Sequence, residues 1–169
     1  MKAILTTLCL LFLVTGAAAE QVYQTPSDFV DQAFAGAPPK PAVLWLNRER
    51  QTVIRQILGH PLRQLRLRYW ARGGKSAWIL QEIGKEHPIT TGIVAEDGKI
   101  GQIRVLIYRE SRGYEVRNAF FTDQFKGAGL DEQLRLDRPI DGISGATLSV
   151  RALTKLARLA LYLDRQRQQ

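Results

Sequence analysis

Cysteine and histidine are the scarcest chemically reactive residues in this sequence. Its 169 residues include one cysteine, Cys9, and two histidines, His60 and His87. Each histidine precedes a proline and has no ligand-like neighbour, so the pattern does not support a metal site. Cys9 lies in an N-terminal segment that we expect to be removed. The mature chain would then lack disulfides, a thiol nucleophile and thiolate metal ligands. The sequence also shows no internal repeat, low-complexity tract or Ser-His-Asp grouping.

The first 19 residues (1–19) have the features of a secretory signal peptide. Lys2 provides a positive start, residues 3–14 are apolar, and Ala17-Ala18-Ala19 offers a cleavage site of small residues. The apolar run is short for a membrane span, and an uncleaved anchor is the alternative interpretation. We therefore expect a periplasmic or other extracytoplasmic location, with membrane association as an option. Removal of 19 of the 169 residues would leave 150, enough for one domain with its own core.

Positive charge exceeds negative charge. The whole chain has 24 Lys and Arg against 16 Asp and Glu, and loss of Lys2 with the signal would leave a net charge of +7. Such a balance favours binding to nucleic acid, to an anionic membrane surface or to an acidic protein partner. The ordinary explanation is a solvated basic face. Export argues against nucleic acid.

The pattern of residues 20–64 predicts an N-terminal helical segment. We expect a loose leader over residues 20–25, a short helix capped by Ser27, and a proline-rich stop at residues 36–41. A short apolar bridge at residues 43–46 leads to Asn47, which can cap a second helix over residues 48–58.

Residues 65–169 predict an α+β domain that forms one compact unit with the preceding segment. Four stretches have strand character, at residues 65–70, 77–83, 89–95 and 99–107. Asp97-Gly98 is a hairpin signal, and short connections imply an antiparallel β-meander. Residues 134–136 would add a fifth short strand. A long amphipathic C-terminal helix follows, over residues 148–165.

A cluster of glycine and hydroxyl residues precedes this last helix. The stretch is Asp141-Gly142-Ile143-Ser144-Gly145-Ala146-Thr147. Its glycines allow a tight turn and close approach of a ligand, and the N-terminus of a helix attracts anions such as phosphate. The simpler interpretation is an Asp-Gly turn followed by a Ser or Thr helix cap.

The stretch resembles the flavinylation motif, Asp-x-x-Ser-Gly-Ala-Thr, of FMN-binding domains. That family includes the FMN-carrying subunits of sodium-pumping NADH:quinone reductase and of Rnf complexes. Asp141, Ser144, Gly145 and Ala146 match the fixed positions and Gly142 a looser one. The resemblance implies FMN joined through its phosphate to Thr147 by a flavin transferase that uses FAD and a divalent metal.

A second region resembles the family in the same order along the chain. Glu110 and Gly113 match a Glu-x-x-Gly segment, and Gln124, Phe125 and Gly127 match the Gln-Phe-x-Gly end of an aromatic-rich helix. Ser111-Arg112 stands where the larger subunits carry Thr-Pro. The resemblance covers about residues 77–163.

The residues of the two regions have expected roles. We expect Asp141 and Ser144 to shape the turn and hydrogen-bond its backbone. Tyr114, Phe120 and Phe121 are candidates for walls around the flavin ring, with core packing as the alternative. No catalytic residue and no metal ligand is assigned.

The resemblance implies an electron-transfer carrier or redox subunit. A membrane reductase or a cytochrome would be its electron donor or acceptor. The alternatives are an exported basic binding module for a membrane protein or lipid, without flavin, and a flavin enzyme with a substrate of its own.

Overall fold

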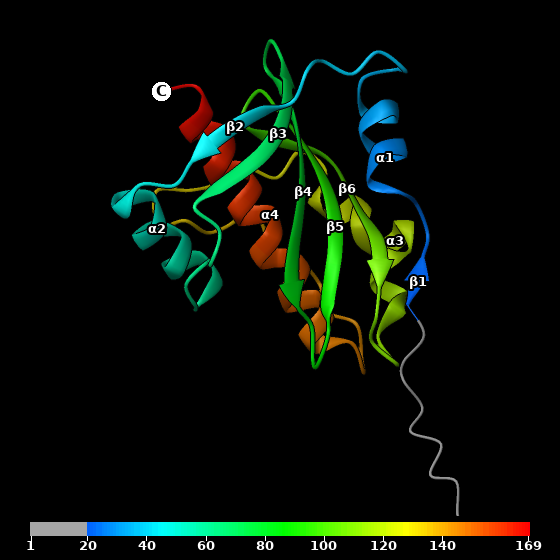
Figure 1. The fold of residues 1–169 in the computed structure, drawn as a ribbon. Helices are drawn as coiled ribbons and strands as arrows, with labels where there is room; N and C mark the ends of the chain where they lie inside the picture. Colours follow the sequence, from blue (N-terminus) through cyan, green and yellow to red (C-terminus); the bar gives the residue numbers. More distant parts are fainter. Residues whose placement is uncertain (1–19) are drawn as a thin grey trace, which may run out of the picture.

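The computed structural model describes residues 20–169, so the predicted signal peptide lies outside the described residues. The chain folds as an α+β structure in which one antiparallel sheet separates two helical layers (Figure 1). The strands are ordered β1-β6-β5-β4-β3-β2 across the sheet. In chain order, the elements are β1 (Gln21–Val22), α1 (Pro26–Ala33), β2 (Ala42–Trp45), α2 (Arg48–Leu58), β3 (Arg66–Arg72), β4 (Lys75–Ile83), β5 (Pro88–Glu96), β6 (Lys99–Tyr108), the 3₁₀ turn η1 (Tyr114–Arg117), α3 (Ala119–Thr122), the 3₁₀ turn η2 (Asp123–Phe125) and α4 (Thr147–Arg167).

The four central strands, β3 to β6, confirm the predicted antiparallel meander. The β5–β6 hairpin turns at Asp97 and Gly98, which both have positive φ, at 50° and 76°. That conformation matches the right-handed twist of the flanking strands and explains the Asp-Gly pair.

The two outer strands were not predicted as strands. The expected loose leader contains β1, which pairs Gln21 with Tyr108 and Val22 with Ile107. The expected apolar bridge is β2, which pairs along β3. These pairings make the sheet six-stranded. By contrast, the fifth strand expected at residues 134–136 is reduced to a single bridge between Leu130 and Leu136.

The helix ends follow local capping rules. Asn47 caps α2 as predicted, since its Oδ1 accepts a hydrogen bond from the Arg50 N–H at 2.9 Å. The cap of α1 is Thr25 rather than Ser27, because the Thr25 hydroxyl accepts from the Asp28 N–H at 3.1 Å. Pro26 occupies the first turn, where no backbone donor is needed.

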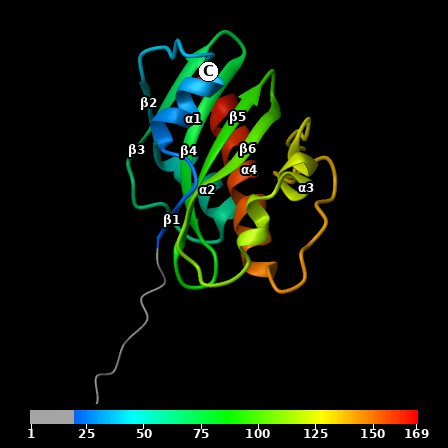
Figure 2. The same ribbon diagram turned by 90° about the vertical axis from the view of Figure 1, so that its right-hand side faces the viewer.

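Helix α4 forms the centre of the main core. It packs along β4, β5 and β6, while α1 covers the opposite face of the sheet (Figure 2). Leu153, Leu156 and Leu163 are fully buried on α4. Near its C-terminal end Asp164, also fully buried, accepts hydrogen bonds from Ser76 Oγ at 2.5 Å and Arg167 Nε at 2.7 Å. These contacts fix α4 against the sheet, and its first turn lies at the other end of the helix. No helix within residues 20–169 is long and apolar enough to cross a membrane.

Candidate functional site

The segment 141–147 forms a turn that places Thr147 at the surface. The Ala146 N–H donates to the Ile143 carbonyl at 3.0 Å, and Gly145 has a φ of 81°, a conformation that disfavours residues with a Cβ. Thr147 is the first residue of α4 and is exposed. Gly142 is also exposed, and an added Cβ there would meet no atom within 4 Å. The structure therefore requires glycine at 145 for its conformation and leaves open space beside both glycines.

The first turn of α4 has no side-chain cap. The residue before the helix is Ala146, and no side-chain cap hydrogen bond is made there within residues 20–169. Thr147 lies inside the helix, so it is not the capping residue that the simpler interpretation of the motif assumed. Uncapped N–H groups and the positive end of the helix dipole make this turn suited to an anion.

A groove of about 570 Å³ lies beside Thr147. One wall is the start of α4, from Gly145 to Ser149. The facing wall comes from Lys85, in the β4–β5 connection, and from residues 110–112, which follow β6. The volume lies within the range of roughly 300–1,000 Å³ that ligand pockets occupy. The two regions of family resemblance thus share one cavity.

Glu110 holds the facing wall in place. Its Oε1 accepts hydrogen bonds from the backbone N–H groups of Lys85, Glu86 and His87, at 2.5, 2.7 and 2.9 Å. Burial by itself would raise the pKa of the Glu110 carboxyl, but the N–H groups of His87, Glu86 and Lys85 outweigh burial and hold the pKa below its ordinary value of 4.5. Because the carboxylate is engaged by the loop, its role here is to position Lys85 at the groove.

Behind the groove, a buried tyrosine links its two walls. The Tyr108 hydroxyl donates to the Arg112 carbonyl at 2.5 Å and shares a 2.9 Å hydrogen bond with Ser149 Oγ on α4. Burial is the main cause that raises the pKa of Tyr108, so the phenol stays protonated and available as a donor. Tyr108 and Ser149 were not among the predicted site residues. Their positions in the sequence could have pointed to them. Tyr108 ends β6 two residues before Glu110, and Ser149 follows Thr147 by two residues.

Gly113 lies where the two walls approach each other closely. It has a φ of 82°, and an added Cβ would lie 3.0 Å from both Ser149 Oγ and Tyr108 Oη and 3.3 Å from the Ala146 Cβ. Glycine is needed here for both its conformation and its small size. The Glu-x-x-Gly segment therefore packs directly on the residue that precedes Thr147.

The loop before Thr147 is held by Gln124 rather than by its own side chains. The backbone N–H of Asp141 donates to Gln124 Oε1 at 2.7 Å. Within the described residues we find no hydrogen bond made by the side chain of Asp141 or Ser144, both of which are exposed. The expectation that these two side chains hydrogen-bond the turn is therefore wrong for this structure.

The predicted aromatic walls do not gather at this groove. Phe121 is fully buried and packs edge-on against Phe125, with ring centroids 5.5 Å apart, so it belongs to the core. Tyr114 and Phe120 are exposed, and neither lines the groove. Of the three, only Tyr114 and Phe120 have surface available to a ligand. Within residues 20–169, no group of three or more His, Cys, Asp or Glu side chains is placed to hold a metal.

A family model for the FMN-binding domain matches residues 84–162. This segment runs from the loop bound by Glu110 to the last turns of α4, and it includes both walls of the groove. Comparisons with curated proteins and with solved structures gave no match.

The groove also suits the phosphate group of FMN, on grounds independent of the comparison. It combines space for a ligand with an uncapped helix start, an exposed hydroxyl and two cationic side chains, Lys85 and Arg112. These are features that suit a phosphate. Residues 84–162 of this chain therefore match the FMN-binding domain family, and this match supports a flavin-binding protein with FMN as its cofactor.

Proposed function

We propose that this protein carries FMN covalently, through an ester between the FMN phosphate and the Thr147 hydroxyl, and acts as an extracytoplasmic electron carrier or redox subunit. The observation that supports this most is the position of Thr147. It is exposed, it lies in the uncapped first turn of α4, and it borders a groove of about 570 Å³. A threonine buried in the core would have excluded attachment.

The surroundings of Thr147 suit a phosphate ester. The N–H groups at the start of α4 would donate to the phosphate oxygens, and Lys85 and Arg112 would compensate their charge from the facing wall. Gly145 leaves the approach open, because nothing lies within 4 Å of the position that a Cβ would occupy. FMN bound in this way would supply the redox chemistry. Tyr114 and Phe120 are the exposed aromatic residues that would be available to its ring.

Attachment needs a second protein. A threonine hydroxyl is a weak nucleophile, and no hydrogen bond joins Thr147 to a basic side chain among the described residues. A flavin transferase with FAD and a divalent metal would supply the base and the activated phosphate. The Thr147 oxygen would form a bond to the phosphorus of the FMN half, the pyrophosphate bond of FAD would break, and AMP would leave. The hydroxyl proton would pass to the transferase.

A covalent link suits a carrier outside the cytoplasm. Where free FMN is scarce, a reversible complex would lose its cofactor by mass action, whereas an ester would not. The predicted signal peptide supports export. A membrane reductase or a cytochrome is the class of protein that would deliver or accept the electrons.

Covalent flavin can be measured directly. The full chain is co-expressed with a flavin transferase, denatured, and examined for flavin fluorescence on the polypeptide and for an intact mass increased by FMN less one water. We expect both signals in the native chain and neither in Thr147→Ala. Thr52→Ala is the matched control, because it removes an exposed threonine hydroxyl from α2, outside the matched residues 84–162, and it should keep both signals. Covalent flavin in Thr147→Ala would overturn the attachment site, and its absence from the native chain would overturn the covalent link.

The carrier role has its own experiment. The flavinylated protein is reduced chemically and then mixed with oxidised cytochromes or redox dyes. Rapid reoxidation by several unrelated acceptors is the result expected of a carrier. Reoxidation only by one small substrate would instead identify a flavin enzyme.

A further inference from the structure

The outer edge of β6 is open in its middle. At one end, β1 pairs with Tyr108 and Ile107, and the N–H groups of Tyr23 and Gln24 donate to the Leu106 carbonyl. At the other end, the N–H and carbonyl of Ile100 pair with Ala128 and Gly127. Between these contacts, residues 101–105 have a strand partner only on the β5 side within the described chain.

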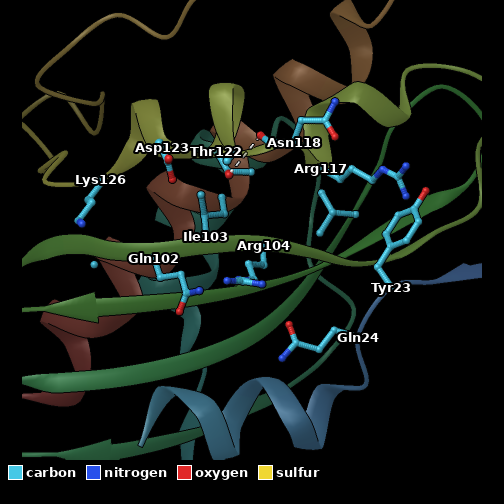
Figure 3. Close-up of a pocket in the computed structure, with 13 residues that line it drawn as sticks. Tyr23, Gln24, Gln102, Ile103, Arg104, Arg117, Asn118, Thr122, Asp123 and Lys126 are labelled. Atoms are coloured by element: carbon cyan, nitrogen blue, oxygen red, sulfur yellow. Dashed lines mark hydrogen bonds between the residues drawn. The ribbon is translucent and has the colours of Figure 1, made fainter. Parts of the chain in front are cut away.

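This open edge forms the floor of a second groove, of about 620 Å³ (Figure 3). Residues 101–105 all line it, Tyr23 and Gln24 lie at one end, and the segment from η1 to η2 forms a wall. In Figure 3, Ile103 points toward α3, whereas Gln102 and Arg104 point toward α1. The strand edge therefore runs along the groove with side chains on both sides of it. No residue is shared with the groove beside Thr147.

The floor offers backbone hydrogen bonds to an added strand. Successive residues of a strand direct their N–H and carbonyl groups to opposite edges, so every second residue of segment 102–105 presents both groups to the groove. The open segment spans about 17 Å at about 3.4 Å per residue, the length of a short strand. Folded proteins usually cover or protect such an edge, because it pairs readily with another chain.

The charges around the groove favour an acidic occupant. Arg104, Arg117 and Lys126 are exposed and line it, and Asp123 is the one acidic residue among its lining residues. Arg117 also lies over the Tyr23 ring, 4.3 Å from its centroid, which holds the guanidinium at the mouth of the groove. In addition, Gln24 Nε2 is buried and has no hydrogen-bond partner within the described residues. A buried donor without a partner is uncommon and would be satisfied by an incoming carbonyl or carboxylate.

We propose that an extended acidic segment of a partner protein binds here as an additional strand on β6. Its backbone would pair with residues 101–105, and its acidic side chains would face Arg104, Arg117 and Lys126. This mode of recognition takes its affinity from backbone hydrogen bonds and its selectivity from alternate side chains. A second copy of this chain is a poorer occupant, because pairing two β6 edges would bring two sets of these cations together. The proposal does not depend on flavin.

The test uses a short peptide of alternating glutamate and valine, blocked at both ends, with the full chain. Binding is measured by titration, and hydrogen exchange of the backbone amides locates it. We expect slower exchange within segment 101–105. A peptide with lysine in place of each glutamate should bind at least about tenfold more weakly, because its positive charge is the same as that of the groove. A peptide with a central proline should also bind more weakly, because it lacks a backbone donor.

Charge-reversal variants separate this groove from general attraction to a basic protein. Arg104→Glu with Lys126→Glu should weaken binding of the glutamate peptide by about tenfold or more. Arg48→Glu with Arg63→Glu changes the net charge equally at exposed positions outside the groove, and it should keep most of the affinity. Equal losses in both variants would overturn the proposal. Protection at another surface, or protection of residues 101–105 that rises with protein concentration without peptide, would also overturn it. The same binding by Thr147→Ala would show that it is independent of the flavin site.

Discussion

Gln124 Oε1 accepts the backbone N–H of Asp141 at 2.7 Å, and this contact joins the end of the aromatic-rich segment to the loop that carries Thr147. Arg138 supports the same connection, because its guanidinium donates to the carbonyls of Lys126 and Gly127. The two regions of family resemblance are therefore joined by a hydrogen bond as well as by a shared groove.

Gln124→Ala should slow covalent flavin incorporation while the protein stays folded. The variant removes one hydrogen bond at the surface, which costs about 1 kcal/mol, but it frees the loop before Thr147. Gln124→Glu keeps an acceptor and should behave much like the native chain. The rate of flavinylation and the exchange of the Asp141 amide measure both effects. Gln133→Ala, at an exposed position, is the control, and an equal slowing there would contradict the role of Gln124.

Gly113→Ala and Gly142→Ala form a matched pair of glycine substitutions. At Gly113 the new Cβ would lie 3.0 Å from two hydroxyl oxygens, at a φ of 82°, whereas at Gly142 it would meet nothing within 4 Å. We expect Gly113→Ala to lower the free energy of unfolding by about 1–3 kcal/mol through strain and to reduce flavinylation. Gly142→Ala should change stability by less than about 0.5 kcal/mol. Chemical denaturation measures the difference, and similar losses in the two variants would refute the packing at Gly113.

The pKa of Glu110 predicts how stability depends on pH. Three backbone N–H groups hold this pKa below the ordinary value of 4.5, so the unfolded chain binds the proton more tightly than the folded chain. The contribution of Glu110 to stability is therefore fully present above about pH 4.5 and is lost as the pH falls through the folded pKa.

Glu110→Gln provides the measurement of that contribution. The neutral amide keeps an acceptor but loses the charge, and we expect a loss of about 1–2 kcal/mol at pH 7. Urea denaturation between pH 7 and pH 3 should show the native chain and the variant approaching each other in stability at the acid end. A constant difference over that range would show that the charge of Glu110 does not act as described.

Local patterns predicted the elements that depend on neighbouring residues. Asp97-Gly98 identified the β5–β6 hairpin because two positive φ angles are needed there, and Asn47 identified the start of α2 because its side chain caps the helix. The apolar stripe of α4 identified the C-terminal helix to within two residues at its end. In the candidate site, the motif predicted Thr147 as the attachment residue, and the structure shows that Thr147 is exposed.

The features missed by sequence interpretation depend on distant pairing. β1 is two residues long and exists because it pairs with Tyr108 and Ile107, far along the chain. Phe120 and Phe121 are neighbours of the same type, yet one is 64% exposed and the other fully buried, a difference set by the orientation of α3 on the core. The support of the Asp141 turn by Gln124 likewise follows from tertiary packing and not from the motif itself.

Thr147 is the first residue of a 21-residue helix whose later turns are mostly buried. The helix therefore leads from this exposed hydroxyl into the main core. A group esterified to Thr147 would move by rotation about its own bonds, while the helix that carries it would stay in place. The distance over which it could reach a redox partner would then be set by the length of the flavin's ribityl chain and not by movement of the protein.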